Sequence, residues 1–203
     1  MMLNVRAMDT YYGETQVLFG VSLTVAAGEI VALLGPSGAG KTTTLRSILG
    51  LTPARSGVVE WQGRDVTRWA THRISRLGIK WVPDDRRVFP TLSAARNLSI
   101  ARRTSPFRPY STADCCEIFP ALRNLLPREC ENMSGGELQM VSISRALAGG
   151  PGLVLFDEPA RGSRRRSYRM SWARYVHCET KGSVRSWSIR TYAPCSTLPI
   201  AST

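Results

Sequence analysis

The sequence has no hydrophobic stretch long enough to cross a lipid bilayer, which takes about 20 consecutive apolar residues. Its longest apolar runs, Ile30 to Leu34 and Leu153 to Phe156, have the length of buried strands. The N-terminal segment includes Asp9 and lacks the apolar core of a signal peptide, so we expect no export. The five cysteines contain no CxxC pair, and their odd number does not fit a secreted disulfide framework. The sequence therefore predicts a reduced, cytoplasmic protein without a transmembrane segment of its own.

Positive charge is unevenly distributed along the 203 residues. The formal net charge of +12 would by itself suggest a nucleic acid or an anionic membrane surface as the partner. However, residues 161–203 hold eight arginines and Lys181 against one acidic residue, Glu179, so two-thirds of the excess charge lies in the last fifth of the chain. The segment after residue 160 is therefore a different kind of sequence from what precedes it.

Apolar runs and turn residues predict the order of the secondary structure. Strands are expected at 17–25, 30–34, 57–61, 79–82 and 152–157, and helices at 41–49, in parts of 91–126 around a loop at 104–109, and from 134 to 149. The uninterrupted apolar run at 30–34 is typical of a strand that is covered on both faces in a parallel sheet. This order predicts an α/β domain with a helical subdomain.

A glycine-rich turn joins the expected strand at 30–34 to the expected helix at 41–49, and it matches the phosphate-loop pattern GxxxxGK[ST]. Glycines let backbone N–H groups approach phosphate oxygens closely, and the positive end of the helix dipole points at the same anion. Lys41 is expected to reach the β- and γ-phosphates of ATP, and the Thr42 hydroxyl to ligate Mg²⁺. The predicted ATP-binding residues of this loop are Gly35, Pro36, Ser37, Gly38, Ala39, Gly40, Lys41, Thr42 and Thr43.

Two carboxylates follow the apolar run at 153–156 directly. A phosphate-loop ATPase needs such groups opposite its phosphate loop. Asp157 would hold Mg²⁺, directly or through water, and Glu158 would orient or deprotonate the attacking water as the catalytic residue. Acidic residues are also common at the ends of ordinary strands, so the phosphate loop upstream is what favours this interpretation.

A third motif, Ser134-Gly135-Gly136-Glu137, lies where a helix is expected to begin. Ser134 and Glu137 have the spacing of a capping box, and a hydroxyl beside two glycines makes a second anion-binding corner. By itself the motif is only a capped helix start. Together with the phosphate loop and the two carboxylates, in this order, it resembles the signature of ATP-binding cassette (ABC) proteins. The resemblance covers about residues 1–162.

This resemblance implies a P-loop NTPase fold of the ABC type over residues 1–160. Such a fold has a mainly parallel core sheet, an antiparallel β subdomain and a helical subdomain, here at about 85–149. Two such domains bind head to tail as a homo- or heterodimer, so each ATP would lie between one phosphate loop and the second subunit's copy of Ser134, Gly135, Gly136 and Glu137. ATP and Mg²⁺ are the implied cofactors.

Two segments narrow the resemblance to the ATP-binding subunits of branched-chain amino acid importers. They are YYGETQVLFGVSLTVAAGEIVALLGPSGAGKTTTLRSILGL and GIKWVPDDRRVFPTLSAARNLSIA. The implied partners are membrane permease subunits, and the implied location is the cytoplasmic face of the cell membrane. Tyr12 aligns with an aromatic that stacks on adenine, although plain packing is the alternative. Asp84 stands where most of the superfamily has a Mg²⁺-sensing glutamine, and Arg86 to Pro90 resemble part of the permease docking surface. A solvated loop is the alternative for both.

The resemblance ends after Pro159. The family continues with a Ser-x-Gly-Leu loop, a helix, and an apolar strand that ends in a switch residue, usually histidine. This chain instead reads ARGSRRR from residue 160. His177 comes too soon after Glu158 and follows no apolar strand, so we do not assign it as the switch residue.

The strand implied at this point lies between the phosphate-loop strand and the strand before Asp157, where a continuous aliphatic run is needed. Residues 184–189 would place Arg185 there, and burying that cation unpaired is expensive. No tail segment is therefore expected to occupy this position. Residues 161–203 are expected to be an out-of-frame or otherwise replaced C-terminus outside the native fold, with the C-terminal part of the core missing or replaced.

Three functions are compatible with these motifs. The first is an ATP-hydrolysing subunit that powers solute import through a permease. The second is an ABC protein that acts in translation or on DNA, for which Tyr168, Trp172 and Tyr175 among the tail arginines are the only support. Since no nucleic-acid-binding motif is present, we expect no nucleic-acid partner. The third is a nucleotide-binding remnant that cannot turn over.

Overall fold

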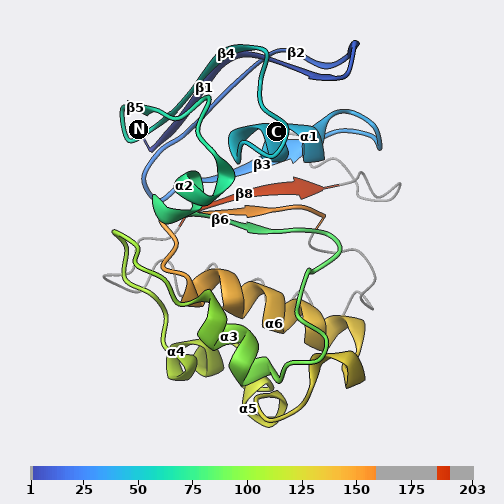
Figure 1. Ribbon diagram of the computed structural model, residues 1–203, viewed down its shortest axis with the longest axis vertical. Helices are drawn as coiled ribbons and strands as arrows, with labels where there is room; N and C mark the ends of the chain where they lie inside the picture. The colour runs from blue at the N-terminus through green and yellow to red at the C-terminus, as the bar shows by residue number, and fades with distance from the viewer. Residues whose placement is uncertain (1, 159–186, 193–203) are drawn as a thin grey trace, which may run out of the picture.

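The computed structural model describes residues 2–158 and 187–192, which form two sheets and the helices that cover them (Figure 1). The antiparallel sheet has the order β2-β1-β4-β5, and the second sheet, which is parallel, has the order β3-β8-β7-β6. The strands are β1 (Leu3–Tyr12), β2 (Thr15–Val25), β3 (Ile30–Leu34), β4 (Ser56–Trp61), β5 (Arg64–Asp65), β6 (Ile79–Val82), β7 (Leu153–Phe156) and β8 (Trp187–Tyr192). The helices are α1 (Lys41–Ile48), α2 (Thr71–Arg76), α3 (Ala94–Ala101), α4 (Thr112–Ile118), α5 (Leu122–Leu125) and α6 (Gly135–Ala148), with a 3₁₀ turn at Cys130–Asn132.

The elements are stacked in layers around the parallel sheet (Figure 1). Helices α1 and α2 and the antiparallel sheet lie on one side, and α3 to α6 lie on the other. Among the described residues, no helix is long and apolar enough to span a membrane. The predicted α/β fold, with a parallel core sheet, an antiparallel sheet and a group of helices, is confirmed.

Strand β7 is buried on both faces, as its apolar sequence predicts. Leu153 and Leu155 pack into the core formed with α1 and the antiparallel sheet. Val154 and Phe156 pack into the core formed with α3 to α6. Full burial of each large apolar side chain contributes roughly 1.5–3 kcal/mol. The strand that carries Asp157 at its end is therefore fixed from both sides.

Strand β1 was not predicted from the sequence, because a bulge interrupts the alternation of buried and exposed residues that marks a strand. Leu3 and Val5 are buried, and the next buried residues are Met8 and Thr10. The register with β2 shifts between Val5 and Met8, where Ala7 has a φ of 43°. Such a bulge moves the buried set by one residue and breaks the period of two that predicts a strand.

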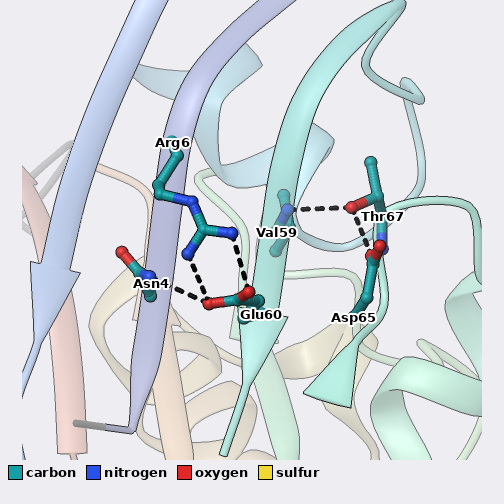
Figure 2. A network of polar contacts seen from close by, with 6 residues as sticks. All are labelled: Asn4, Arg6, Val59, Glu60, Asp65 and Thr67. Atoms are coloured by element: carbon teal, nitrogen blue, oxygen red, sulfur yellow. Dashed lines mark hydrogen bonds and ion pairs between the residues drawn. The ribbon is translucent and has the colours of Figure 1, made fainter. Parts of the chain in front are cut away.

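Polar contacts join β1 to β4 and close the β4–β5 turn (Figure 2). The Arg6 guanidinium donates to both carboxylate oxygens of Glu60, at 2.7 and 2.8 Å, and Asn4 Nδ2 donates to the same carboxylate at 2.9 Å. The Thr67 hydroxyl accepts from Val59 N and donates to Asp65. These contacts tie the two central strands of the antiparallel sheet together and hold the segment after β5 against β4.

The position between β3 and β7 is filled, and the expectation that no tail segment would take it is wrong. Strand β8 pairs in parallel with β3, from Ile30–Ser188 to Leu34–Tyr192, and with β7, from Leu153–Trp187 to Phe156–Arg190. Ladder hydrogen bonds come from the backbone, so a segment need not be aliphatic to supply them. The β-branched and aromatic residues of WSIRTY also favour an extended strand. His177 and the remaining tail positions lie outside the described residues.

Strand β3 is less covered than its apolar run predicts. Val31 and Leu33 pack against the core formed with α1, but Ile30 is 38% exposed and Leu34 is 75% exposed. The expectation of burial on both faces is therefore wrong for this strand, because the described residues cover only one of its faces.

Candidate functional site

A pocket of about 290 Å³ lies at the start of α1. It brings together six of the predicted ATP-binding residues and Glu158, which is more than a hundred positions away in the sequence. Its lining residues are Val17, Ser37, Gly38, Gly40, Lys41, Thr42, Thr43 and Glu158. Gly35, Pro36 and Ala39 belong to the same loop but are not among the lining residues.

The backbone of the loop requires glycine where it turns into α1. Gly40 is the N-cap of α1 and has a φ of 83°, in the left-handed region. A Cβ atom at this position would lie 2.6 Å from Leu18 Cδ2, closer than packed atoms approach. No side chain caps this helix start. The first N–H groups of α1 are therefore available to an anion, and the helix dipole favours one there.

The Lys41 side chain folds back over the loop. Its Nζ donates to Gly35 O and to Pro36 O, both at 2.9 Å, and the residue is only 8% exposed. The cation is therefore held within the loop that is predicted to wrap the phosphates. A charge-assisted hydrogen bond to phosphate is stronger than one to a neutral carbonyl, so a nucleotide can compete for this ammonium group.

The end of β7 is tied to the start of α1 by one side-chain hydrogen bond. Thr42 Oγ1 donates to Asp157 Oδ1 at 2.9 Å. Asp157 is 1% exposed, and its backbone N–H donates to Val82 O at 3.0 Å. The structure thus places the two predicted Mg²⁺ ligands side by side, with Thr42 in the pocket lining and Asp157 directly behind it.

This pair of groups fits Mg²⁺. Hydroxyl and carboxylate oxygens are hard ligands, and Mg²⁺ is usually held by one or two protein oxygens together with phosphate and water. Within residues 2–158 no cluster of three or more His, Cys, Asp or Glu side chains is placed to hold a metal. A metal at Thr42 and Asp157 would therefore need the phosphates of a nucleotide to complete its coordination.

Glu158 adopts a backbone conformation that is unusual for glutamate. Its φ is 41°, and the residue is half-buried at the pocket wall. A non-glycine residue in this region carries backbone strain, which is common where function requires a particular side-chain direction. The turn after β7 ends the strand and places Glu158 in the lining of the predicted phosphate pocket.

The Ser134-Gly135-Gly136-Glu137 motif begins α6 with the predicted capping box. Ser134 N donates to Glu137 Oε2 at 2.7 Å, and Glu137 N donates to Ser134 Oγ at 3.4 Å. The Ser134 hydrogen bonds hold the pKa of Glu137 below its ordinary value, and Arg128 adds to this effect. None of the four residues lines the pocket at α1. In this chain the motif and the phosphate loop are therefore separate.

Two further predicted residues lie outside the pocket lining. Tyr12 ends β1 and is 46% exposed, and hydrogen bonding with Thr52 lowers its pKa. Asp84 is half-buried in the turn after β6. The described structure does not bring either residue into the set that contains Lys41, so their roles stay predictions.

A second hollow was not anticipated from the sequence. This groove of about 570 Å³ lies between α2 and β6 on one side and α3 and α6 on the other. We call it the basic groove, after the cations that line it: Arg76, Lys80, Arg86, Arg87, Arg103 and Arg145. These residues come from five segments that are scattered over 70 positions, so no local pattern reveals them.

The loop after β6 is fastened to α6 at the groove. Arg86 and Arg87 both have positive φ, at 63° and 40°. Ser142 Oγ donates to Arg86 O at 2.8 Å, and the Arg145 guanidinium donates to Arg87 O. The only signal in the sequence is the i, i+3 spacing of Ser142 and Arg145 on a largely apolar helix.

Comparisons with known proteins agree with this architecture. The family model described as ABC transporter matches residues 18–161. The branched-chain amino acid transport ATP-binding protein BraG of Pseudomonas aeruginosa is 39% identical over 163 residues, which are 79% of this chain and 70% of BraG. The lipopolysaccharide export ATP-binding protein LptB of Acidithiobacillus ferridurans is 37% identical over 79% of this chain and 68% of LptB.

Solved structures show the same fold. A nucleotide-free ATP-binding cassette from an ABC transporter superposes with a TM-score of 0.78 at 23% identity, over 94% of this chain and 81% of the other. A dimeric cassette in a post-hydrolysis state, bound to ADP and Pi, gives the same TM-score over 94% of this chain and 88% of the other. The chain therefore belongs to the ABC transporter family, as an ATP-binding domain whose chemistry is ATP hydrolysis coupled to transport.

Proposed function

We propose that this chain is the ATP-hydrolysing subunit that energises the import of branched-chain amino acids through a membrane permease, on the cytoplasmic face of the cell membrane. The hydrogen bond between Thr42 and Asp157 carries the ATPase part, because it joins both halves of a Mg·ATP site at 2.9 Å. The similarity to BraG, and to LivF of Archaeoglobus fulgidus at 34% identity, supports the solute class. Relatives named for sulfate import and lipopolysaccharide export define the competing solutes.

The described groups divide the chemistry among themselves. The loop amides at Gly38 and Gly40 and the Lys41 ammonium bind the phosphates of ATP. Thr42 and Asp157 would hold Mg²⁺, and the metal would supply positive charge against the charge that develops on the phosphates. Glu158 orients the attacking water and accepts its proton, since this residue lines the same pocket. Catalysis then rests mainly on positioning and on charge stabilisation.

The complete site contains two copies of the chain or one copy and a paralogue. Ser134, Gly135 and Gly136 begin α6, where the capping box pairs the N–H groups of Ser134 and Glu137, and they do not line the pocket at α1. A second subunit placed head to tail supplies this motif to the γ-phosphate. Each chain then contributes two half-sites.

The permease is proposed to dock beside the loop at Arg86 to Pro90. Arg86 and Arg87 line the basic groove, and Phe89 is 45% exposed next to them. A partner seated there contacts the strained loop that α6 holds through Ser142 and Arg145. Docking at this loop therefore reaches the helix that carries the Ser134 motif.

Uptake of radiolabelled solute tests the function. Source cells from which the gene has been deleted are expected to lose ATP-dependent leucine uptake and to keep sulfate uptake. A plasmid copy should restore leucine uptake, and a Lys41→Ala copy should not, although it is expressed at the same level. Loss of sulfate uptake with normal leucine uptake would contradict the proposed solute.

A further inference from the structure

Strand β3 lies at one end of the parallel sheet and, among the described residues, has a neighbouring strand on one side only. It pairs with β8, and the order of the sheet is β3-β8-β7-β6. Outside this ladder, no backbone hydrogen bond joins residues 30–34 to another described segment. The N–H and C=O groups along such an edge are a template for a further strand. A partner that pairs with this edge must therefore itself be extended.

One face of β3 is apolar and open to solvent. Val31 and Leu33 pack against the core formed with α1, whereas the alternate residues Ile30, Ala32 and Leu34 are exposed. We call these three residues the outer face of β3. Edge strands usually resist pairing through charged side chains or proline, but residues 30–34 contain neither. This edge therefore lacks the common protection against a second strand.

The sequence of β3 is complementary to a second copy of itself. In an antiparallel pair centred on Ala32, Ile30 of one copy lies opposite Leu34 of the other, and Ala32 lies opposite Ala32. The large apolar side chains then cover each other, and the small one lies on the two-fold axis. Glu29, the charged residue nearest in sequence, lies opposite Gly35, so like charges do not meet. Such a contact uses the same surface on both copies and closes after two chains.

We propose that two copies of this chain associate through antiparallel pairing of their β3 edges, which joins the two parallel sheets into one. This contact is separate from the proposed head-to-tail contact, because it uses backbone groups and apolar side chains and needs no nucleotide between the chains. A membrane or an apolar ligand would cover the outer face of β3 but would leave the backbone groups of the edge without partners, whereas an added strand satisfies both. Since each copy pairs only five residues, the contact belongs to the small and weak class, below about 1,200 Å².

Sedimentation velocity of the full chain, without nucleotide and with EDTA, measures the association over roughly 10 µM to 1 mM, where exposed strand edges associate. The test variant Ala32→Glu places two carboxylates opposite each other on the two-fold axis. The matched control Thr24→Glu adds the same charge at an exposed position of β2, the edge strand of the other sheet. We expect reversible dimers of the wild-type chain and the control, and at least about 10-fold weaker association of Ala32→Glu. Melting curves of the three chains show whether each is folded.

Cysteine crosslinking tests the register of the pair. Residues directly opposite each other in an antiparallel pair have Cβ atoms about 5 Å apart, which a disulfide bridges after a small adjustment. Ala32→Cys should therefore crosslink to itself, with oxidised glutathione as the oxidant. Leu34→Cys should not, because its two copies lie about 13 Å apart along the strands, but it should crosslink to Ile30→Cys in a mixture. All these chains also carry Cys178→Ser and Cys195→Ser, and the other three cysteines are buried.

Several results would overturn the inference. A wild-type chain that stays monomeric at about 1 mM has no self-pairing edge, and protection of the Leu34→Cys thiol from a thiol reagent in that monomer would assign the edge to another segment of the same chain. Equal association of folded Ala32→Glu and Thr24→Glu chains would place the contact elsewhere. Self-crosslinking of Leu34→Cys as fast as that of Ala32→Cys would exclude the pairing, and this criterion decides if Ala32→Glu does not fold.

Discussion

Replacing Thr42 by valine isolates the contact that joins the two halves of the nucleotide site. Valine has nearly the same shape as threonine but cannot donate to Asp157. The lost hydrogen bond is 2.9 Å long, and its acceptor belongs to a carboxylate that is 1% exposed. A hydrogen bond to a charged group contributes roughly 1.5–3 kcal/mol, so Thr42→Val should lower the free energy of unfolding by about 2 kcal/mol.

The loss of stability is measured without nucleotide, and the loss of metal-dependent ATP affinity is measured with it. For a chain of this size about 2 kcal/mol corresponds to a fall of roughly 4–8 °C in the melting temperature. The variant should also lose most of the difference between ATP affinity with Mg²⁺ and ATP affinity with EDTA, because one predicted metal ligand is gone. Thermal unfolding and calorimetric titration provide the two numbers.

Thr44→Val is the matched control. The Thr44 hydroxyl donates to Gly40 O at 3.0 Å, is buried, and does not line the pocket. Its neutral hydrogen bond contributes about 1 kcal/mol, so this variant should be mildly destabilised and should keep its Mg²⁺-dependent ATP affinity. Equal Mg²⁺ dependence in Thr42→Val and Thr44→Val would refute the assignment of Thr42 and Asp157.

Three other predictions concern the shared site, the capping box and the tail. A mixture of Glu158→Gln and Ser134→Arg chains should hydrolyse ATP, because one of its two sites contains only unaltered halves; full turnover by either variant alone, as a monomer, would exclude the shared site. Glu137→Gln should lower the melting temperature at neutral pH. The difference from wild type should vanish as pH falls through the lowered pKa of Glu137, because only the ionised carboxylate stabilises the folded chain; a difference that persists in strong acid would count against this. The 203-residue chain should turn over ATP far more slowly than BraG assayed in parallel, since residues 161–203 offer no apolar strand that ends in a switch histidine; equal rates would contradict this, and a shifted reading frame near codon 160 without an aliphatic strand would remove the frameshift hypothesis.

Local sequence was sufficient wherever a short segment makes its own structure. The phosphate loop, the apolar strand before Asp157 and the capping box of Ser134 and Glu137 each depend on neighbouring residues. Their backbone geometry follows from glycine, β-branched and capping residues in fixed positions. The structure therefore places them as the sequence predicts.

Features that depend on long-range packing could not be predicted from local sequence. The alternation of β1 is hidden by the bulge at Ala7, and the exposure of Leu34 depends on what covers the second face of β3. Trp187–Tyr192 forms a strand between β3 and β7 because both neighbours offer backbone hydrogen-bonding groups along their edges, and not because its own sequence is aliphatic. The basic groove is assembled from separate elements, so its charge has no local pattern.

Binding of Mg·ATP to the wild-type and Lys41→Ala chains, measured by calorimetry, tests the central claim most directly. Lys41 is the cation held within the phosphate loop, through hydrogen bonds to Gly35 O and Pro36 O. The account predicts a saturable binding heat for the wild-type chain and a loss of at least about 100-fold in affinity for the variant, as expected when two charge-assisted hydrogen bonds to phosphate are removed. Equal affinity of the two chains for Mg·ATP would contradict the assignment of this loop as the nucleotide site.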